Sequence, residues 1–185
     1  MVDKSKLGLV QVFWGNGKGK TTSALGSALR ACGNGYKVHL VQFMKNGTGD
    51  HEIDYPGEIR ALEKFSNFSF IRFGSGSWVI GKPKNHHIEE VNHAFSYLEE
   101  CFSKDYDIII ADEILYAVQL GLVEESKVIE LIKRVKCGEV KKEFILTGSH
   151  IPLNNIFEFA DLVSEIKKIK HPYDSGIMAR KGLDY

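Results

Sequence analysis

The chain of 185 residues predicts an α/β fold, in which helices cover both faces of a mostly parallel sheet. Short apolar runs alternate with segments of helical spacing from one end of the chain to the other, which is the pattern of strands joined by crossover helices. No linker, internal repeat or low-complexity tract interrupts this alternation. Residues 1–185 are therefore expected to form a single domain.

The expected strands are apolar runs bounded by turn signals. In chain order they are residues 9–14, 37–43, 68–73, 107–111 and 144–147, followed by 162–170 near an edge. The expected helices are segments in which apolar residues recur every three or four positions. In chain order they are residues 21–34, 58–65, 85–104, 124–136 and 154–159. The stretches 45–56 and 74–84 are expected to be surface loops.

The expected helix 85–104 has a clear apolar face. That face consists of Ile88, Val91, Ala94, Phe95, Leu98 and Phe102. Three histidines of the same helix, His86, His87 and His93, are expected to face solvent. Metal binding by these histidines is not favoured, because no carboxylate or cysteine lies at ligand spacing from them.

The composition bounds the class of protein. Lys+Arg 24 balances Asp+Glu 24, so no overall charge attracts nucleic acid or an anionic membrane. No signal-peptide core is present in residues 1–7, and no apolar run approaches the roughly 20 residues of a membrane span. Cys32, Cys101 and Cys137 fit no metal or disulfide framework. We expect free thiols in a reducing, cytoplasmic location.

The segment after the first expected strand is rich in glycine and ends in lysine and threonine. It comprises Gly15, Asn16, Gly17, Lys18, Gly19, Lys20, Thr21 and Thr22. Glycines let the backbone curl so that N–H groups point into one hollow, and the following helix adds partial positive charge there. Lys20 can reach phosphate oxygens, and the Thr21 hydroxyl can ligate Mg²⁺. The segment predicts a phosphate loop and a P-loop NTPase architecture of the RecA-like kind.

The spacing of this loop departs from the common pattern G-x-x-x-x-G-K-[ST]. Trp14 occupies the position of the first glycine, and Gly15 comes one residue late. One interpretation is that Gly15 makes a slightly different turn in an ordinary NTPase. The other is that the triphosphate is held differently because the chemistry differs. The spacing alone leaves both open.

Two acids, Asp112 and Glu113, follow the buried strand 107–111. Parallel strands present their carboxyl ends at one edge of the sheet, so these acids and the loops after Trp14 and Phe43 are expected to converge on one crevice. One carboxylate can hold Mg²⁺, and the other can position a water or join the metal. The alternative is that the acids cap the next helix at Ile114.

Several segments together resemble the ATP:corrinoid adenosyltransferases of the phosphate-loop type, over nearly the whole chain. The shortened glycine loop is a trait of that family, and it is followed here by the matching Ala24, Gly26 and Arg30. Further matching segments are 41–45 (VQFMK), 112–113 (DE), 146–148 (LTG), 160–165 (ADLVSE), 170–177 (KHPYDSGI) and 182–185 (GLDY).

The resemblance implies that the Co(I) centre of a corrinoid attacks the 5′ carbon of ATP, so that the 5′-deoxyadenosyl group passes to cobalt and triphosphate leaves. Co(I) carries no proton, so this reaction needs no general base. Loop amides, Lys18 and Lys20 would stabilise the leaving triphosphate. Mg²⁺ would be the cofactor, held by Thr21, Asp112 and Glu113.

The resemblance also implies roles for residues outside the phosphate loop. Arg30 matches an arginine expected near phosphate, against the alternative of a solvated helix arginine. Trp78, assisted by Phe73, is expected to contact the corrinoid. His171 is either a substrate contact or a simple turn residue. The expected partners are a second copy of the chain in a homodimer and an external reductant such as a flavodoxin or a flavin reductase.

Two positions depart from the family pattern. Gly76 stands where a phenylalanine is frequent, and Ser149, followed by His150, stands where an arginine is usual. The details of lower-ligand displacement and of one phosphate contact stay open, as does the natural corrinoid. Two other functions also stay open: a RecA-like Mg-ATPase in which Glu113 activates water, and a nucleotide-gated corrinoid carrier.

Overall fold

The structure, a computed structural model, describes residues 2–45, 55–74, 76 and 82–184. These residues form a six-stranded sheet in the order β3-β2-β4-β5-β1-β6, and every strand pair in it is parallel. The strands are β1 (Val10–Trp14), β2 (Val38–Gln42), β3 (Phe68–Arg72), β4 (Ile108–Asp112), β5 (Glu143–Thr147) and β6 (Leu162–Glu165). All six lie where the sequence predicts strands.

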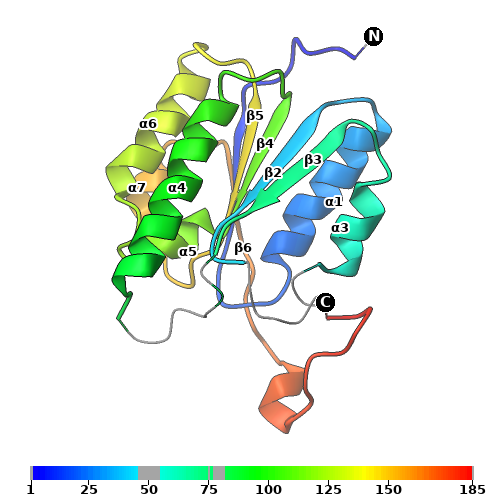
Figure 1. The fold of residues 1–185 in the computed structure, drawn as a ribbon, viewed down its shortest axis with the longest axis vertical. Coiled ribbons are helices and arrows are strands. Elements are labelled where there is room, and N and C mark those ends of the chain that lie inside the picture. Colours follow the sequence, from blue (N-terminus) through cyan, green and yellow to red (C-terminus); the bar gives the residue numbers. More distant parts are fainter. Residues whose placement is uncertain (1, 46–54, 75, 77–81, 185) are drawn as a thin grey trace.

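Helices cover both faces of the sheet (Figure 1). One face carries α1 (Lys20–Gly33) and α3 (Gly57–Leu62). The other face carries α4 (Asn85–Cys101), α5 (Ile114–Gln119), α6 (Glu125–Lys136) and α7 (Asn154–Phe157). The predicted α/β class, with a parallel sheet between two helical layers, is confirmed.

Burial along the central strands explains their continuous apolar sequences. All five residues of β2 and of β4 are buried. Successive side chains of a strand point to opposite faces, so Ile109 packs with the α4–α6 core while Ile110 packs with the α1–α3 core. The edge strand β6 is mostly exposed, in agreement with its alternation of apolar and polar residues.

One expectation for α4 is wrong. Ile88 is 41% exposed, and His87 is buried in its place. His87 lies in the first turn of the helix, where its Nδ1 accepts a hydrogen bond from the Lys84 N–H at 3.1 Å. The side chain therefore folds back onto the helix start instead of entering solvent. His86 and His93 are exposed, as expected.

Two further features bear on the sequence predictions. The three cysteines are free thiols, of which Cys32 and Cys101 are buried. None of the helices in the described part of the chain has the length and apolar character needed to cross a membrane.

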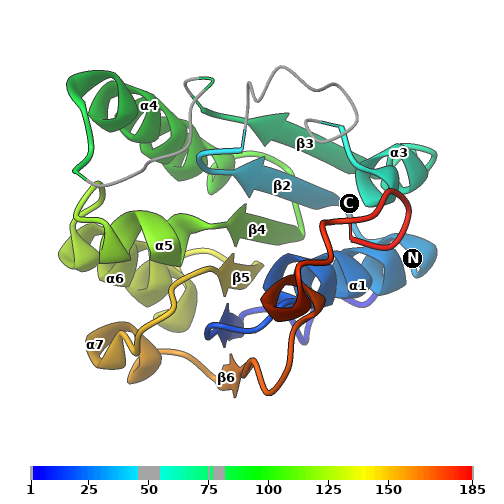
Figure 2. The same cartoon turned by 90° about the horizontal axis from the view of Figure 1, so that it is seen from below.

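The C-terminal tail passes beneath the carboxyl ends of the strands. After β6 the chain forms the short 3₁₀ helix η1 (Pro172–Ser175) and then turns back toward α1 and α3 (Figures 1 and 2). The tail therefore reaches the end of the sheet at which ligands bind in folds of this type.

Candidate functional site

The phosphate loop joins β1 to α1 and is packed against the chain that follows β6. The Gly17 N–H donates a hydrogen bond to the Ile166 carbonyl at 2.7 Å, and the Asn16 Oδ1 accepts one from the Lys168 N–H at 2.9 Å. A Cβ at Gly15 would lie 2.4 Å from the Ile166 oxygen, and one at Gly17 would lie 2.8 Å from it. Only glycine fits at both positions. The close approach of the segment after β6 therefore explains why the loop has glycines there.

The start of α1 is shaped to receive an anion. Gly19 precedes the helix with a φ of 123°, and no side chain caps the helix N-terminus. The first-turn N–H groups and the positive end of the helix dipole therefore point into the loop. This arrangement is the one that the glycine-rich sequence predicts.

Lys20 lies across the loop that it follows. Its Nζ donates to the carbonyl oxygens of Gly15 at 2.7 Å and Gly17 at 3.1 Å. Burial lowers the pKa of Lys20, against the opposing attraction of Glu113. The half-buried ammonium is thus held at the centre of the loop, where phosphate oxygens would be stronger acceptors than these carbonyls.

Asp112 lies at the end of β4 and is completely buried. Its Oδ1 accepts hydrogen bonds from the hydroxyls of Thr21 at 2.9 Å and Thr147 at 2.6 Å. Its Oδ2 accepts a hydrogen bond from the Gln42 amide at 2.9 Å and lies 2.9 Å from the Lys45 ammonium. Burial opposes ionisation, but Lys45 and these hydrogen bonds hold the pKa of Asp112 below its ordinary value. The carboxylate therefore stays charged although no water reaches it.

Lys45 brings a second ammonium to the same place. Its Nζ lies 3.0 Å from Thr21 Oγ1 and 3.5 Å from Glu113 Oε1, besides its contact with Asp112. Burial favours the neutral amine, but the two carboxylates outweigh it and raise the pKa of Lys45. Lys45 is therefore a cation at the centre of an oxygen-rich cluster.

Glu113 has an unusual backbone conformation. Its φ of 65° is in the left-handed region, which favours glycine, and its N–H donates to Thr147 Oγ1 at 3.0 Å. Although Glu113 stands at the N-cap position of α5, its side chain makes no capping hydrogen bond. A Cβ at Gly148 would lie 3.1 Å from the Glu113 Oε2, so a glycine there leaves room for this carboxylate. The helix-capping alternative is therefore wrong for Glu113, and its side chain turns toward Lys45.

These contacts define one constellation, which we call the Asp112 cluster. It consists of Thr21, Gln42, Lys45, Asp112, Glu113 and Thr147. The sequence predicts the convergence of the loops after β1, β2 and β4, and the contacts confirm it. It does not reveal that Gln42, Lys45 and Thr147 contact the acids. The sequence does show that these three residues lie at or just after the ends of expected strands. Their contact with the acids follows only once β2 and β5 are known to flank β4.

The donor set of the cluster fits Mg²⁺. The hydroxyl of Thr21 and the carboxylates of Asp112 and Glu113 already surround one cation, the Lys45 ammonium. Hard oxygen ligands of this kind, supplied by one or two carboxylates and completed by substrate phosphates, suit Mg²⁺. Among the described residues no group of three His, Cys, Asp or Glu side chains could hold a metal alone. The cluster therefore offers an incomplete set of metal ligands, which phosphate oxygens would complete.

Other predicted site residues lie apart from the cluster. Arg30 is exposed in the last turn of α1. Ten residues of α-helix separate it from Lys20, which is about 15 Å along the axis. A contact between Arg30 and phosphate stays a prediction, beside the alternative of a solvated helix arginine.

Two predicted substrate contacts have structural partners of their own. His171 Nδ1 accepts a hydrogen bond from the Tyr173 N–H at 3.1 Å, at the start of η1. Phe73 follows β3, is half-buried and packs against Tyr97 with ring centroids 5.7 Å apart. Trp78 lies outside the described residues. A contact of these three residues with a corrinoid stays a prediction.

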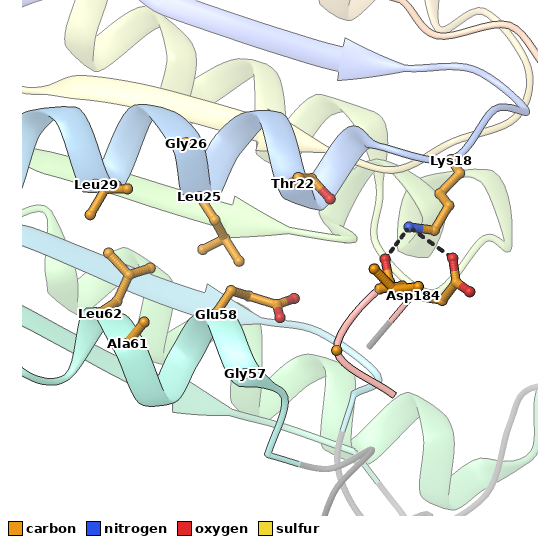
Figure 3. A pocket seen from close by; sticks show the side chains of 12 residues that line it. Lys18, Thr22, Leu25, Gly26, Leu29, Gly57, Glu58, Ala61, Leu62 and Asp184 are labelled. Carbon is orange, nitrogen blue, oxygen red and sulfur yellow. Dashed lines mark hydrogen bonds and ion pairs between the residues drawn. The ribbon is translucent and has the colours of Figure 1, made fainter. Parts of the chain in front are cut away.

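A cavity of about 450 Å³ opens beside the phosphate loop, between α1, α3 and the C-terminal tail (Figure 3). Leucines form its apolar walls, and Lys18 reaches across its end to the Leu183 carbonyl and the Asp184 carboxylate, each at 3.4 Å. The lining residues are Lys18, Thr22, Leu25, Gly26, Leu29, Gly57, Glu58, Ala61, Leu62, Gly182, Leu183 and Asp184. None of them belongs to the Asp112 cluster.

Comparison with known proteins identifies relatives over the full length of this architecture. Residues 6–185 match the family model described as ATP:corrinoid adenosyltransferase BtuR/CobO/CobP. The corrinoid adenosyltransferase of Escherichia coli K12 is 33% identical over 182 residues, which cover 96% of this chain and 86% of the relative. The corrinoid adenosyltransferase of Salmonella typhimurium is 32% identical over 185 residues, with the same coverage of both chains.

Solved structures agree on the fold. The flagellar accessory protein FlaH of Methanocaldococcus jannaschii superimposes with a TM-score of 0.56 at 16% identity, covering 86% of this chain and 71% of that one. A KaiC-like protein of Pyrococcus horikoshii gives a TM-score of 0.53 at 16% identity, covering 89% and 75%. Both likenesses concern the fold alone, and they agree with the predicted α/β fold, in which helices cover both faces of a parallel sheet.

Proposed function

The chain belongs to the ATP:corrinoid adenosyltransferase family, and we propose that it transfers the 5′-deoxyadenosyl group of ATP to the Co(I) centre of a corrinoid. The electron pair of Co(I) forms the bond to the 5′ carbon of the ribose. The bond from that carbon to the phosphate oxygen breaks, and its electron pair leaves with inorganic triphosphate. The nucleophile carries no proton, so the protein contributes position and charge rather than a general base.

The phosphate loop is the part of the chain that stabilises the leaving group in this proposal. The first-turn amides of α1 and the Lys20 ammonium neutralise charge that builds up on the triphosphate as the bond breaks. Lys20 already rests against the Gly15 and Gly17 carbonyls, so it needs only a small rearrangement to meet phosphate oxygens. Asn16 ties the loop to the chain after β6, and Thr22 and Lys18, which line the neighbouring cavity, are proposed as further nucleotide contacts.

Mg²⁺ is the proposed cofactor, with Thr21, Asp112 and Glu113 as the residues that hold it. When bound, the ion would supply positive charge to the triphosphate. Thr147 and Gln42 support this set, because their hydrogen bonds fix the Asp112 carboxylate in one orientation. The metal is expected to bind more tightly when the nucleotide is present, because phosphate oxygens complete its ligands.

The corrinoid is proposed to bind near the end of β3, where Phe73 lies, with Trp78 as a further contact and His171 as a third. Reduction of cobalt is assigned to an external reductant such as a flavodoxin or a flavin reductase. We further propose that the chain acts as one domain, in a homodimer, and that it works in a reducing cytoplasm, a location that its free thiols support.

One observation carries the proposal. Lys20 lies across the phosphate loop, and the Thr21 hydroxyl contacts both Lys45 and the Asp112 carboxylate, in a chain that matches the family over residues 6–185. This arrangement supports a site for a metal-bound polyphosphate. No feature of this site requires that a bond between phosphates be the one that breaks.

The test follows the corrinoid and the nucleotide together. The protein is incubated with ATP, Mg²⁺, cobalamin and a strong reductant, and the corrinoid spectrum and the phosphate products are recorded. A light-sensitive alkylcobalamin formed together with triphosphate supports the proposal. ADP and phosphate without alkylation would instead identify an ATPase, and corrinoid binding with intact ATP would identify a carrier.

A further inference from the structure

Lys45 occupies the point on which the proposed metal ligands converge. Its Nζ lies 3.0 Å from Thr21 Oγ1 and 2.9 Å from Asp112 Oδ2. The third oxygen, Glu113 Oε1, lies at 3.5 Å. A Mg²⁺ ion binds such oxygens at about 2.0–2.1 Å and repels a neighbouring ammonium. The metal and the Lys45 ammonium therefore cannot use these three oxygens at the same time.

The backbone of Lys45 is fixed, whereas its side chain can turn. Met44, the residue before it, has a φ of 56°, which a non-glycine residue adopts at a cost, and the Lys45 N–H donates to the Phe73 carbonyl at 2.9 Å. The side chain is 27% exposed, so it borders the open part of the site. The four-carbon side chain of a lysine rotates about several bonds. Its Nζ can therefore move across the mouth of the phosphate loop while the Cα stays in place.

We propose that Lys45 is a placeholder cation in the nucleotide-free protein and a triphosphate contact in the loaded one. This proposal rests on the proposed function. Without nucleotide, the ammonium compensates the charges of Asp112 and Glu113 and keeps their oxygens in ligand positions. When Mg·ATP enters, Lys45 releases these oxygens to the metal and turns to the phosphate chain, where it balances charge on the leaving triphosphate. The buried carboxylate of Asp112 thus has a cation beside it in both states.

The proposal predicts that Lys45 competes with a divalent cation, which can be measured without corrinoid or turnover. Mn²⁺ is titrated into the nucleotide-free full chain, and the free ion is followed by electron paramagnetic resonance. Lys45→Met keeps the length of the side chain but removes its charge, and it is expected to bind Mn²⁺ about tenfold more tightly than the wild type. Mn²⁺ affinity that is equal in this variant and the wild type would overturn the placeholder role.

The matched control is Lys37→Met. Lys37 precedes β2, as Lys45 follows it, and its ammonium pairs with Asp105 at the opposite end of the strand. The control variant loses the same net charge but no contact with the Asp112 cluster. It is expected to bind Mn²⁺ as the wild type does. Tighter binding by both variants would show an effect of net charge and would also overturn the placeholder role.

Lys45→Met is expected to lower the stability of the protein, and a second measurement uses this loss as a further test. Thermal unfolding is recorded in EDTA and again in saturating Mn²⁺. The variant is expected to melt below the wild type in EDTA and to gain more from Mn²⁺ than the wild type gains, because the ion then replaces the missing ammonium. A gain no larger than that of the wild type would contradict the proposal.

Inorganic triphosphate with Mg²⁺ tests the second role. Lys45→Met is expected to bind it about tenfold more weakly than the wild type does. Equal affinity would remove Lys45 from the triphosphate contacts. A wild-type protein that fails to bind Mg-triphosphate at all would instead count against the proposed function, so the two failures are distinguishable.

Discussion

The Thr21 hydroxyl donates a hydrogen bond to the Asp112 Oδ1 across 2.9 Å. This bond joins the first turn of α1 to the end of β4, two elements that lie far apart in the sequence. Asp112 is completely buried, and its remaining lone pairs accept hydrogen bonds from Thr147 and Gln42. The phosphate loop is therefore attached to the centre of the sheet by a fully satisfied carboxylate.

Asp112→Asn tests this attachment. The new amide group presents a donor to Gln42 or to Thr21, and Lys45 loses its buried counter-charge. Breaking a buried ion pair in this way is expected to lower the free energy of unfolding by about 3 kcal/mol. The quantity is measured by urea denaturation at pH 7. Asp105→Asn, which removes the exposed partner of Lys37, serves as the control and is expected to leave the midpoint unchanged.

Lys20→Ala tests the charge contact to the triphosphate. Within the described part of the chain, the lysine donates only to carbonyls of its own loop, so the fold is expected to persist. The rate of alkylcobalamin formation should fall by the equivalent of about 2–4 kcal/mol in transition-state stabilisation. Circular dichroism and thermal unfolding verify that the variant is folded. A near-normal rate in a folded variant would show that the triphosphate site is assigned wrongly.

Gly15→Ala tests the close approach of the loop to the chain after β6. The added Cβ would meet the Ile166 carbonyl at 2.4 Å, and the φ of 114° is unfavourable for alanine. ATP binding, measured by calorimetry, is expected to be lost or greatly weakened because the loop must shift. Gly33→Ala is the matched control, since nothing lies within 4 Å of its added Cβ. If both variants bind ATP equally well, the tight packing of the loop does not matter for binding.

The pH dependence of stability is expected to report on His39, a buried residue of β2 that does not belong to the Asp112 cluster. His39 is buried between Tyr106, on which it stacks, and the hydroxyls of Ser69 and Tyr97. Burial lowers the pKa of His39 to about 4 from an ordinary value of 6.5. Between these two values the unfolded chain binds a proton that the native chain does not, so stability falls as the pH falls from 6.5 to 4.

The size of this effect is expected to be about 2–3 kcal/mol. Carboxylates also titrate in part of this range, so the measurement compares the wild type with His39→Gln. The variant lacks the titrating ring, and the difference between the two unfolding free energies should shrink or reverse toward pH 4. A constant difference from pH 7 to pH 4 would mean that the native His39 takes up its proton normally.

The sequence was sufficient for the elements whose signals are local. The apolar run Ile108–Ile110 predicts a strand buried on both faces, and β4 is such a strand. The glycines before Lys20 predict a tight loop, and the contacts of Gly15 and Gly17 with Ile166 explain why no larger residue fits. In both cases the signal in the sequence is local, although Ile166, the residue that leaves no room for a larger side chain in the loop, lies far along the chain.

Features that depend on strand order could not be predicted. Lys45 and Thr147 acquire their roles because β2 and β5 flank β4, which no local pattern reveals. For Arg30 the resemblance suggests a phosphate contact, whereas the structure shows an exposed side chain in the last turn of α1, and the contact stays a prediction. The expectation that His87 faces solvent was wrong for another reason. The first turn of a helix can bury a side chain that the helical period assigns to solvent.

The proposed reaction is defined by the bond of ATP that breaks, and one measurement identifies that bond directly. The phosphate products of a single preparation are separated and quantified while the protein consumes ATP in the presence of Mg²⁺ and reduced cobalamin. We expect one inorganic triphosphate for each adenosylcobalamin formed, with no ADP. ADP and orthophosphate in place of triphosphate would contradict this expectation, because the bond between phosphates would then be the one that this site cleaves.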